Sequence, residues 1–132
     1  MTTQPRRVLV VDDLADWRTT LRGVLADKGY HVDVAASSEQ ALQTLESAAY
    51  DVALIDMRLE DGDEDNKEGL ALARKIRIRW PKVRIVIVTG YGVTDDIRQA
   101  REPDAAGQIL AEEFVPKSDI ASLLKTVQRL LP

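Results

Sequence analysis

The sequence contains no cysteine and only one histidine, His31. The absence of cysteine excludes disulfides, zinc sites built on thiolates and catalysis by a thiol. A single histidine cannot supply a two-histidine metal site, and it argues against a serine-type catalytic triad. The apolar run near the N-terminus is too short for a signal peptide or a membrane span. We therefore expect a cytoplasmic protein that does not enter a membrane.

Length and charge set further limits. A chain of 132 residues can build one hydrophobic core but not two, so we expect a single domain over 1–132, with its core over 7–131. Apolar residues make up 45% and charged residues 30%, which is ordinary for a globular protein. The net charge of −4 argues against direct nucleic-acid binding by this domain. A DNA-binding domain could still lie in a partner or in a longer native chain.

Short apolar runs alternate with longer segments that have helical spacing. Three of the runs are nearly all Val, Ile and Leu without alternation, which favours strands buried on both faces of a parallel sheet. The second run alternates and the fifth contains Pro116, so both are predicted at sheet edges. These features favour an α/β, flavodoxin-like (βα)5 doubly wound fold with the strand order 2-1-3-4-5. The predicted strands are Arg7–Val11, His31–Ala35, Tyr50–Ile55, Arg84–Val88 and Glu113–Pro116.

The segments between the strands predict helices with recognisable ends. The first covers 16–28 and stops at Gly29, a typical residue just beyond a helix C-terminus. Ser37 opens a capping box for the second helix, and Ser118 is the expected cap of the last. The segment 95–110 is the least regular of the predicted helices, because a proline and a glycine interrupt it.

Polar side chains follow four of the predicted strands. Asp12 and Asp13 follow the first strand and Asp56 the third, while Thr89 follows the fourth and Lys117 the fifth. Open α/β sheets bind ligands at the carboxyl ends of their strands, so these side chains should meet there. Three carboxylates, a hydroxyl and an ammonium at one place indicate chemistry on a phosphoryl group held by a divalent metal. Mg²⁺ is the hard cation that suits such oxygen ligands.

Each of these residues also has an ordinary structural interpretation. Asp56 could be a turn or N-cap residue, and Asp12 and Asp13 could begin the first helix, where carboxylates are favourable anyway. Lys117 could be a surface lysine, and Thr89 is simply a good strand residue. What favours a functional site is that all of them are expected at one edge of one sheet.

In this order and at these strand ends, the residues resemble the receiver domain of two-component response regulators. The resemblance covers Val8 to Leu131 and rests on Asp12-Asp13, Asp56, Thr89-Gly90 and Phe114-Val-Pro-Lys117. It implies a switch that takes a phosphoryl group from a sensor histidine kinase or a histidine phosphotransfer protein onto Asp56. Lys117 and Thr89 would assist as catalytic residues, and Thr89 and Phe114 would be the switch pair. Such a domain catalyses its own phosphorylation and dephosphorylation, without being an enzyme for an external substrate.

The resemblance also implies a metal site and partners. Asp13, Asp56 and the backbone carbonyl of Arg58 would bind Mg²⁺ directly, and Asp12 would bind it through water. Arg58 and Tyr91 would flank the path of the attacking water, and their bulk predicts slow autodephosphorylation. Output would pass through the face formed by the fourth helix, fifth strand and last helix, to an effector protein or to an output domain missing from this chain. A homodimer remains open, as do the cognate kinase and the pathway.

The chain departs from the family pattern in three places. Glu60 stands where the family has a proline, and an acidic stretch over 60–66 delays the following glycine, Gly69. We interpret 60–66 as a solvated loop; the alternative is that it tunes access or partner choice. Ser118 replaces the proline that usually follows the site lysine, so a trans peptide bond is expected there. The stretch from Thr89 to Lys117 is longer than usual.

Two other functions compete with the phosphorylated switch. One is a receiver-like binding module that does not depend on phosphorylation, which the three departures favour and the retained site residues disfavour. The other is a phosphatase with an aspartate nucleophile, similar to haloacid dehalogenases. Those enzymes place a second aspartate two residues after the nucleophile, where this chain has Arg58.

Overall fold

The computed structural model describes residues 6–57, 68–90, 102–103, 107 and 109–131. Five parallel strands form one sheet in the order β2-β1-β3-β4-β5, which confirms the predicted topology. The strands are β1 (Arg7–Val11), β2 (His31–Ala35), β3 (Val52–Asp56), β4 (Arg84–Thr89) and β5 (Glu113–Pro116). The helices are α1 (Ala15–Asp27), α2 (Ser38–Ser47), α3 (Glu68–Arg79) and α5 (Ile120–Leu130).

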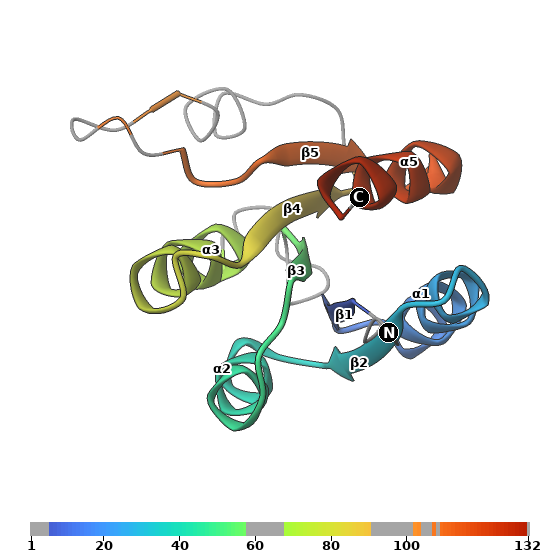
Figure 1. Ribbon diagram of the computed structural model, residues 1–132, viewed down its shortest axis with the longest axis horizontal. Coiled ribbons are helices and arrows are strands. Elements are labelled where there is room, and N and C mark those ends of the chain that lie inside the picture. The colour runs from blue at the N-terminus through green and yellow to red at the C-terminus, as the bar shows by residue number, and fades with distance from the viewer. Residues whose placement is uncertain (1–5, 58–67, 91–101, 104–106, 108, 132) are drawn as a thin grey trace, which may run out of the picture.

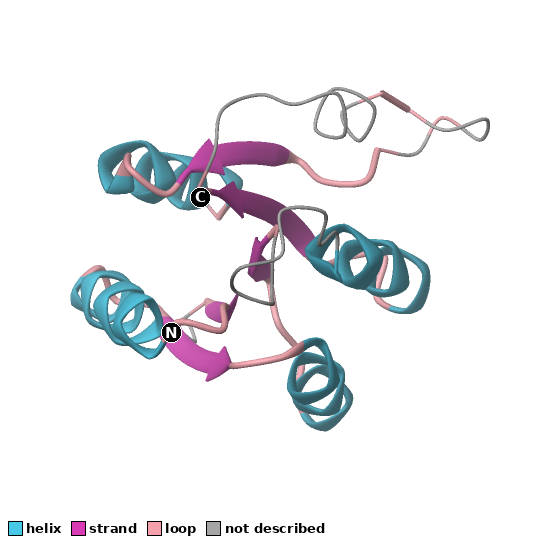
Figure 2. Ribbon diagram, turned by 180° about the vertical axis from the view of Figure 1, so that it is seen from behind, coloured by secondary structure: helices cyan, strands magenta, loops and turns pink. Residues whose placement is uncertain are grey.

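The helices cover the sheet on both faces. Helices α1 and α5 lie on one side and α2 and α3 on the other, as Figure 1 and the reverse view in Figure 2 show. The α1/α5 side contains one apolar cluster, with buried Leu21, Leu25, Leu123 and Val127 from the helices. The α2/α3 side contains a second one, with buried Ala41, Leu45, Leu70, Leu72, Ala73 and Ile76. Burial on both faces explains the continuous apolar runs of the central strands.

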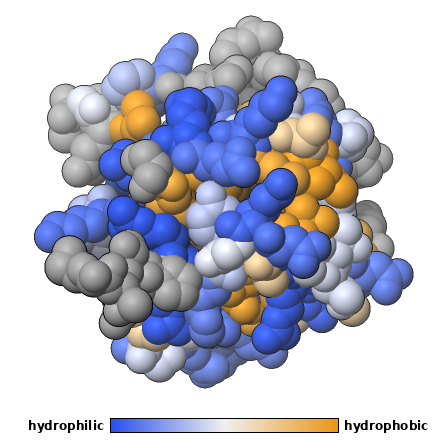
Figure 3. All heavy atoms as spheres, turned by 45° about the vertical axis from the view of Figure 1, so that its right-hand side comes forward, coloured by the Kyte–Doolittle hydropathy of each residue, from blue (hydrophilic) through white to orange (hydrophobic). Residues whose placement is uncertain are grey.

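The edge strands are those that the sequence predicted. β2 is only partly buried, and β5, which contains Pro116, pairs with β4 alone. On the side of the molecule shown in Figure 3, hydrophilic side chains cover most of the surface, and apolar ones lie between them. None of the described helices combines the length and the apolar character that crossing a membrane requires.

The helix ends follow the sequence signals, with one exception. Gly29 ends α1 with a positive φ of 93°, and the Ser37 hydroxyl accepts a hydrogen bond from the Gln40 amide at the start of α2. The cap of α5 is Asp119, so the prediction of Ser118 was wrong. Asp119 Oδ1 lies 3.0 Å from the Ser122 amide, and it takes the cap because the helix begins one residue later than expected. The predicted helix over 95–110 falls mainly outside the described residues.

A largely buried ion pair ties α3 to the segment that leads into β5. The Arg77 guanidinium donates to both carboxylate oxygens of Glu112, each at 2.9 Å, and it also donates to the Leu110 carbonyl. Glu112 in turn accepts a hydrogen bond from the Ile85 amide at the start of β4. The two charged side chains are 13% and 14% exposed. Three elements are therefore held together at one point.

A second polar group lies on β2, at the edge of the sheet. The Tyr50 hydroxyl donates to Asp33 Oδ2 at 2.5 Å, and Arg7 and His31 each lie 3.4 Å from the same oxygen. Burial, followed by the hydrogen bond to Asp33, raises the pKa of Tyr50 to about 12. The hydrogen bond from Tyr50 is the main cause that lowers the pKa of Asp33.

Candidate functional site

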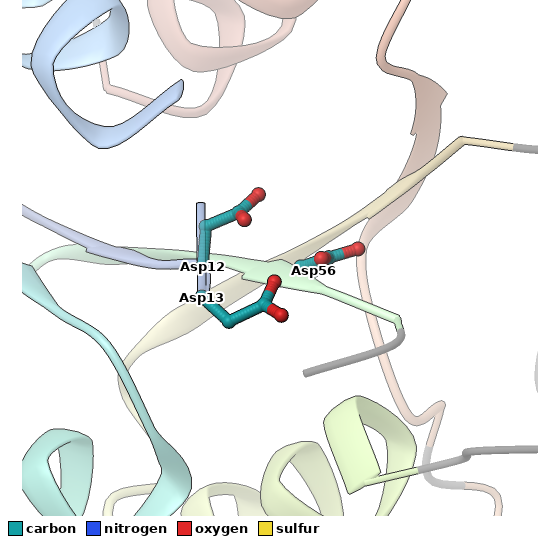
Figure 4. Close-up of side chains that lie close together, drawn as sticks. All are labelled: Asp12, Asp13 and Asp56. Carbon is teal, nitrogen blue, oxygen red and sulfur yellow. The ribbon is translucent and has the colours of Figure 1, made fainter. Parts of the chain in front are cut away.

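The carboxyl ends of the strands bring the predicted polar residues together. Asp12 follows β1, Asp56 ends β3, Thr89 ends β4 and Lys117 follows β5. Asp12, Asp13 and Asp56 each offer a carboxylate oxygen, and these oxygens lie within 4.8 Å of one another. Figure 4 shows the neighbouring Asp12 and Asp13 at the end of β1, beside Asp56.

The alternation of each strand decides where these side chains point. Asp12, Asp56 and Lys117 each come two residues after a buried residue of the α1/α5 cluster, so they continue that face beyond the strand ends. The three preceding residues are Val10, Leu54 and Val115. Because every second side chain of a strand lies on the same face, the polar residue two positions beyond each buried apolar residue lies on that face too, at the carboxyl end of the strand.

Asp12 is the most deeply buried carboxylate of the group, with 1% of its surface exposed. Its Oδ1 accepts a hydrogen bond from the Leu14 amide at 2.9 Å, and its backbone carbonyl accepts one from the Arg18 guanidinium at 2.7 Å. These contacts hold the turn from β1 into α1 in a fixed shape. The orientation of Asp12 is thus set before any ligand binds.

Lys117 bridges two of the carboxylates. Its Nζ lies 2.8 Å from Asp12 Oδ2 and 3.2 Å from Asp56 Oδ2. Burial, the largest effect on the pKa of Lys117, lowers it, but the hydrogen bonds and charges of Asp12 and Asp56 together raise it above its usual value. The ring of Trp17 lies 5.5 Å from Nζ, within reach of a cation–π contact. Lys117 is therefore a fixed positive charge beside Asp56.

Asp13 lies beside the buried carboxylate of Asp12. Burial, followed by the negative charge of Asp12, raises the pKa of Asp13 above its usual value. A divalent cation among the three carboxylates would relieve this repulsion. Closely spaced carboxylate oxygens are also the donors that Mg²⁺ prefers. The residues present therefore fit a magnesium ion.

Thr89 and Phe114 occupy neighbouring strands on the other face of the sheet. Thr89 is buried and follows Ile87 on the α2/α3 face of β4, and Phe114 is paired with Ile87 across the ladder. The Phe114 ring is partly buried against the cluster on that face. The Thr89 carbonyl accepts a hydrogen bond from the Lys117 amide at 2.7 Å. The backbone thus links Thr89 directly to Lys117.

Gly69 brings α3 directly onto the backbone behind the site. Its amide donates to the Met57 carbonyl at 3.1 Å. A Cβ atom at this position would lie 2.0 Å from the Asp56 carbonyl oxygen and 2.7 Å from the Met57 Cα atom. Only glycine permits this approach, so the glycine that comes late in the sequence still meets Asp56.

Some predicted features lie outside the described residues, and some contacts were not predicted. The predicted features that lie outside the described residues are Arg58, Tyr91 and the acidic stretch 60–66. The sequence did not predict the contacts of Arg18 with Asp12 and of Trp17 with Lys117. Trp17 was predicted only as an apolar residue of the first helix, and nothing in its spacing indicates a contact 100 residues along the chain. The peptide bond between Lys117 and Ser118 is trans, as predicted.

A family model described as the response regulator receiver domain matches residues 8–127. The chain belongs to this family. The match covers nearly the whole chain and agrees with the five-stranded order and with the acidic group at the strand ends. The chain thus forms a receiver domain, and its Asp12, Asp13, Asp56 and Lys117 are consistent with a phosphoacceptor switch.

Individual relatives agree with this assignment. The receiver domain is 28% identical over 126 residues to the sporulation initiation phosphotransferase F of Bacillus subtilis, covering 96% of this chain and 94% of that protein. It is 35% identical over 104 residues to the alginate biosynthesis transcriptional regulatory protein AlgB of Pseudomonas aeruginosa, covering 79% of this chain but 22% of AlgB. The chain therefore spans about a fifth of AlgB.

A solved structure in complex with Mg²⁺-BeF shows the same fold. The response regulator TrrA of Thermotoga maritima, solved in complex with Mg²⁺-BeF, is 31% identical and superimposes with a TM-score of 0.76. The alignment covers 96% of this chain and 99% of TrrA. Receiver domains accept phosphoryl groups from histidine kinases or phosphotransfer proteins, so a donor of this class is expected here.

Proposed function

We propose that Asp56 is the phosphoacceptor of a magnesium-dependent switch formed by one receiver domain over 1–132. The observation that carries this proposal is the position of Asp56 at a rigid strand end, with Lys117 Nζ 3.2 Å from one carboxylate oxygen and two further carboxylates nearby. Such an arrangement supports phosphoryl transfer by position and charge.

The chemical step is a displacement at phosphorus. A carboxylate oxygen of Asp56 forms a bond to the phosphorus of a phosphohistidine, and the P–N bond breaks with its electron pair moving to the imidazole nitrogen. The product is an acyl phosphate on Asp56. Lys117, held protonated by its carboxylate neighbours, is close enough to move onto a phosphoryl oxygen. Thr89 completes the set of catalytic residues by donating its hydroxyl to the phosphoryl group.

Metal binding is assigned to the same carboxylates. Asp13 and Asp56 would ligate Mg²⁺ directly, Asp12 would act through water, and the Arg58 carbonyl would be a further ligand. Magnesium at this place supplies positive charge against the phosphoryl oxygens, which lets an anionic carboxylate approach an anionic group. The close spacing of the three carboxylates and the Mg²⁺-BeF complex of TrrA support this assignment.

Signalling would follow from a shift between two conformations of Thr89 and Phe114. Engagement of the phosphoryl group by Thr89 favours an inward position of Phe114, because both side chains lie on the same face of adjacent strands. The affected surface includes β5 and α5 and would contact an effector or an output domain. Direct nucleic-acid binding by this domain is not part of the proposal.

The decisive experiment is intact mass spectrometry after incubation with acetyl phosphate and Mg²⁺. The wild-type protein should gain one phosphoryl group, and Asp56→Asn should gain none. Added Mg²⁺ should raise the melting temperature of the wild type, since a ligand that binds only the folded state stabilises it, and Asp13→Asn should reduce this gain. Intact metal binding without any mass gain would contradict the switch and favour the phosphorylation-independent module.

The lifetime of the acyl phosphate is a separate prediction. Because Arg58 and Tyr91 would flank the path of the attacking water, we expect the phosphoryl group on Asp56 to persist for minutes or longer. The measurement is the decay of the phosphorylated mass after acetyl phosphate is removed. Loss of the phosphoryl group within seconds would refute the role given to these two side chains, while leaving Asp56 as the phosphoacceptor.

A further inference from the structure

The charge of this receiver domain is distributed unevenly along the chain. Between Glu68 and Asp95 there are six cationic side chains and no carboxylate, although the chain as a whole has a net charge of −4. Most of these cations belong to α3 and to the turn that follows it. The phosphoacceptor chemistry uses none of them.

The outer face of α3 presents several of these cations around an exposed apolar residue. We call Arg74, Lys75, Ile78, Arg79 and Lys82 the α3 basic surface; all five are exposed. Ile78 is 80% exposed, compared with 44% for Leu14 and 40% for Ile109, the other exposed large apolar residues of the described part of the chain. The buried apolar residues of α3 are Leu70, Leu72, Ala73 and Ile76, so Ile78 lies outside the core.

Most of this positive charge has no partner among the residues that the structure describes. Arg79 is bound to Glu46 at 2.7 Å and stacks on the Trp80 ring at 4.5 Å. Arg74, Lys75 and Lys82 form no ion pair or hydrogen bond with any residue that the structure describes. In addition, Lys75 and Arg79 are like charges four residues apart on the helix, a spacing that weakens it. The α3 basic surface therefore slightly lowers the stability of α3.

The chemistry of the surface favours one class of partner. Nucleic acid would pair with the cations but leave Ile78 without an apolar contact. A membrane-surface helix needs a wide apolar face, and α3 exposes a single isoleucine. An acidic protein segment with an apolar side chain matches both the cations and Ile78.

We propose that the α3 basic surface binds an acidic segment of a partner protein, with an apolar side chain of that segment against Ile78. The contact lies apart from the carboxylates at the strand ends, so it does not depend on phosphorylation of Asp56. Electrostatic attraction would provide orientation and a fast approach, and burial of Ile78 would add an apolar contact at the centre.

The test uses fluorescently labelled peptides and fluorescence anisotropy. The probe is a synthetic peptide of Asp and Glu residues with interspersed Leu and Phe, and its control carries the same charges with Ser in place of Leu and Phe. The wild-type domain should bind the probe at least fivefold more tightly than the control peptide. Raising the salt concentration should weaken both complexes, because the exposed charges are screened.

Two charge-reversal variants separate this surface from a general charge effect. Arg74→Glu/Lys75→Glu should weaken probe binding at least tenfold. Arg22→Glu/Lys28→Glu, at exposed residues of α1 and of its C-terminal cap, changes the net charge equally and should weaken probe binding less than twofold. Ile78→Ser should remove the preference for the apolar probe, and Asp56→Asn should bind like the wild type. Unchanged melting temperatures would show that the variants are folded.

Several outcomes would overturn the proposal. These are no binding of the probe, equal losses in the two charge-reversal variants, and an unchanged preference in Ile78→Ser. Tighter binding of single-stranded DNA or of phosphatidylserine vesicles at the same surface would overturn the assigned partner class. Self-association of the wild type that Arg74→Glu/Lys75→Glu abolishes in sedimentation velocity would show that the partner is a second copy instead.

Discussion

Replacing Gly69 by alanine tests the link between α3 and the phosphoacceptor strand. The new Cβ atom would lie 2.0 Å from the Asp56 carbonyl oxygen and 2.7 and 2.8 Å from the Cα and carbonyl oxygen of Met57. All three atoms belong to the backbone, so no side chain can rotate away. Either α3 or the end of β3 must move by about 1.4 Å to bring the contact with the Asp56 carbonyl oxygen from 2.0 Å to an ordinary 3.4 Å.

The expected cost follows from two opposing effects. Overpacking against a rigid neighbour costs typically about 1–3 kcal/mol, whereas alanine in a helix gains roughly 0.5–1 kcal/mol over glycine. Because only backbone can yield, we expect Gly69→Ala to lose about 2 kcal/mol net, which lowers the melting temperature by roughly 7 °C for a domain of this size. A shift of Asp56 should also slow phosphorylation by acetyl phosphate about tenfold or more, since reacting groups tolerate little misplacement.

Gly23 provides a matched control. It lies within α1, and an added Cβ would meet nothing within 4 Å. Gly23→Ala should therefore stabilise the domain by roughly 0.5–1 kcal/mol and leave the phosphorylation rate unchanged. The assays are urea unfolding monitored by circular dichroism and the rate of mass gain with acetyl phosphate. If both variants changed stability in the same direction and by similar amounts, the close approach of α3 to Asp56 would be refuted.

Two further predictions concern polar contacts away from the site. Tyr50 has a pKa of about 12, above the value near 10 of the unfolded chain, so the wild type should lose stability as the pH rises from about 10 to 12. Tyr50→Phe should lose less stability than the wild type across this range in urea unfolding, because only the loss from other groups such as Lys117 remains, and parallel curves would contradict the hydrogen bond to Asp33. Arg77→Met leaves Glu112 buried without its charge partner and should cost about 3–5 kcal/mol. Arg77→Met/Glu112→Gln should recover at least half of that loss in the same assay, and equal losses would mean that the uncompensated charge is not the cause.

The sequence predicted the fold better than the local contacts. The strand order and the two edge strands are confirmed, because continuous apolar runs and Pro116 reflect burial and position in the sheet directly. The cap of α5 was predicted one residue too early, at Ser118 instead of Asp119, since both side chains can cap a helix and only the first turn decides between them. The metal ligand Arg58 and the phosphoacceptor role of Asp56 stay predictions.

The sequence by itself determined the site at the level of strand ends. Asp12, Asp13, Asp56, Thr89 and Lys117 converge because parallel strands share one carboxyl edge, and this follows from the order of apolar runs and polar endings alone.

Only the tertiary structure decided which atoms pair within and around that site. The bridge from Lys117 to Asp12 and Asp56 and the contact of Gly69 behind Asp56 join residues that are far apart in the chain. Their geometry depends on strand register, helix position and burial, which no local pattern encodes. A residue's type and spacing can predict the sheet edge or helix face on which it lies. The residues that it contacts are decided only when the helices pack against the sheet.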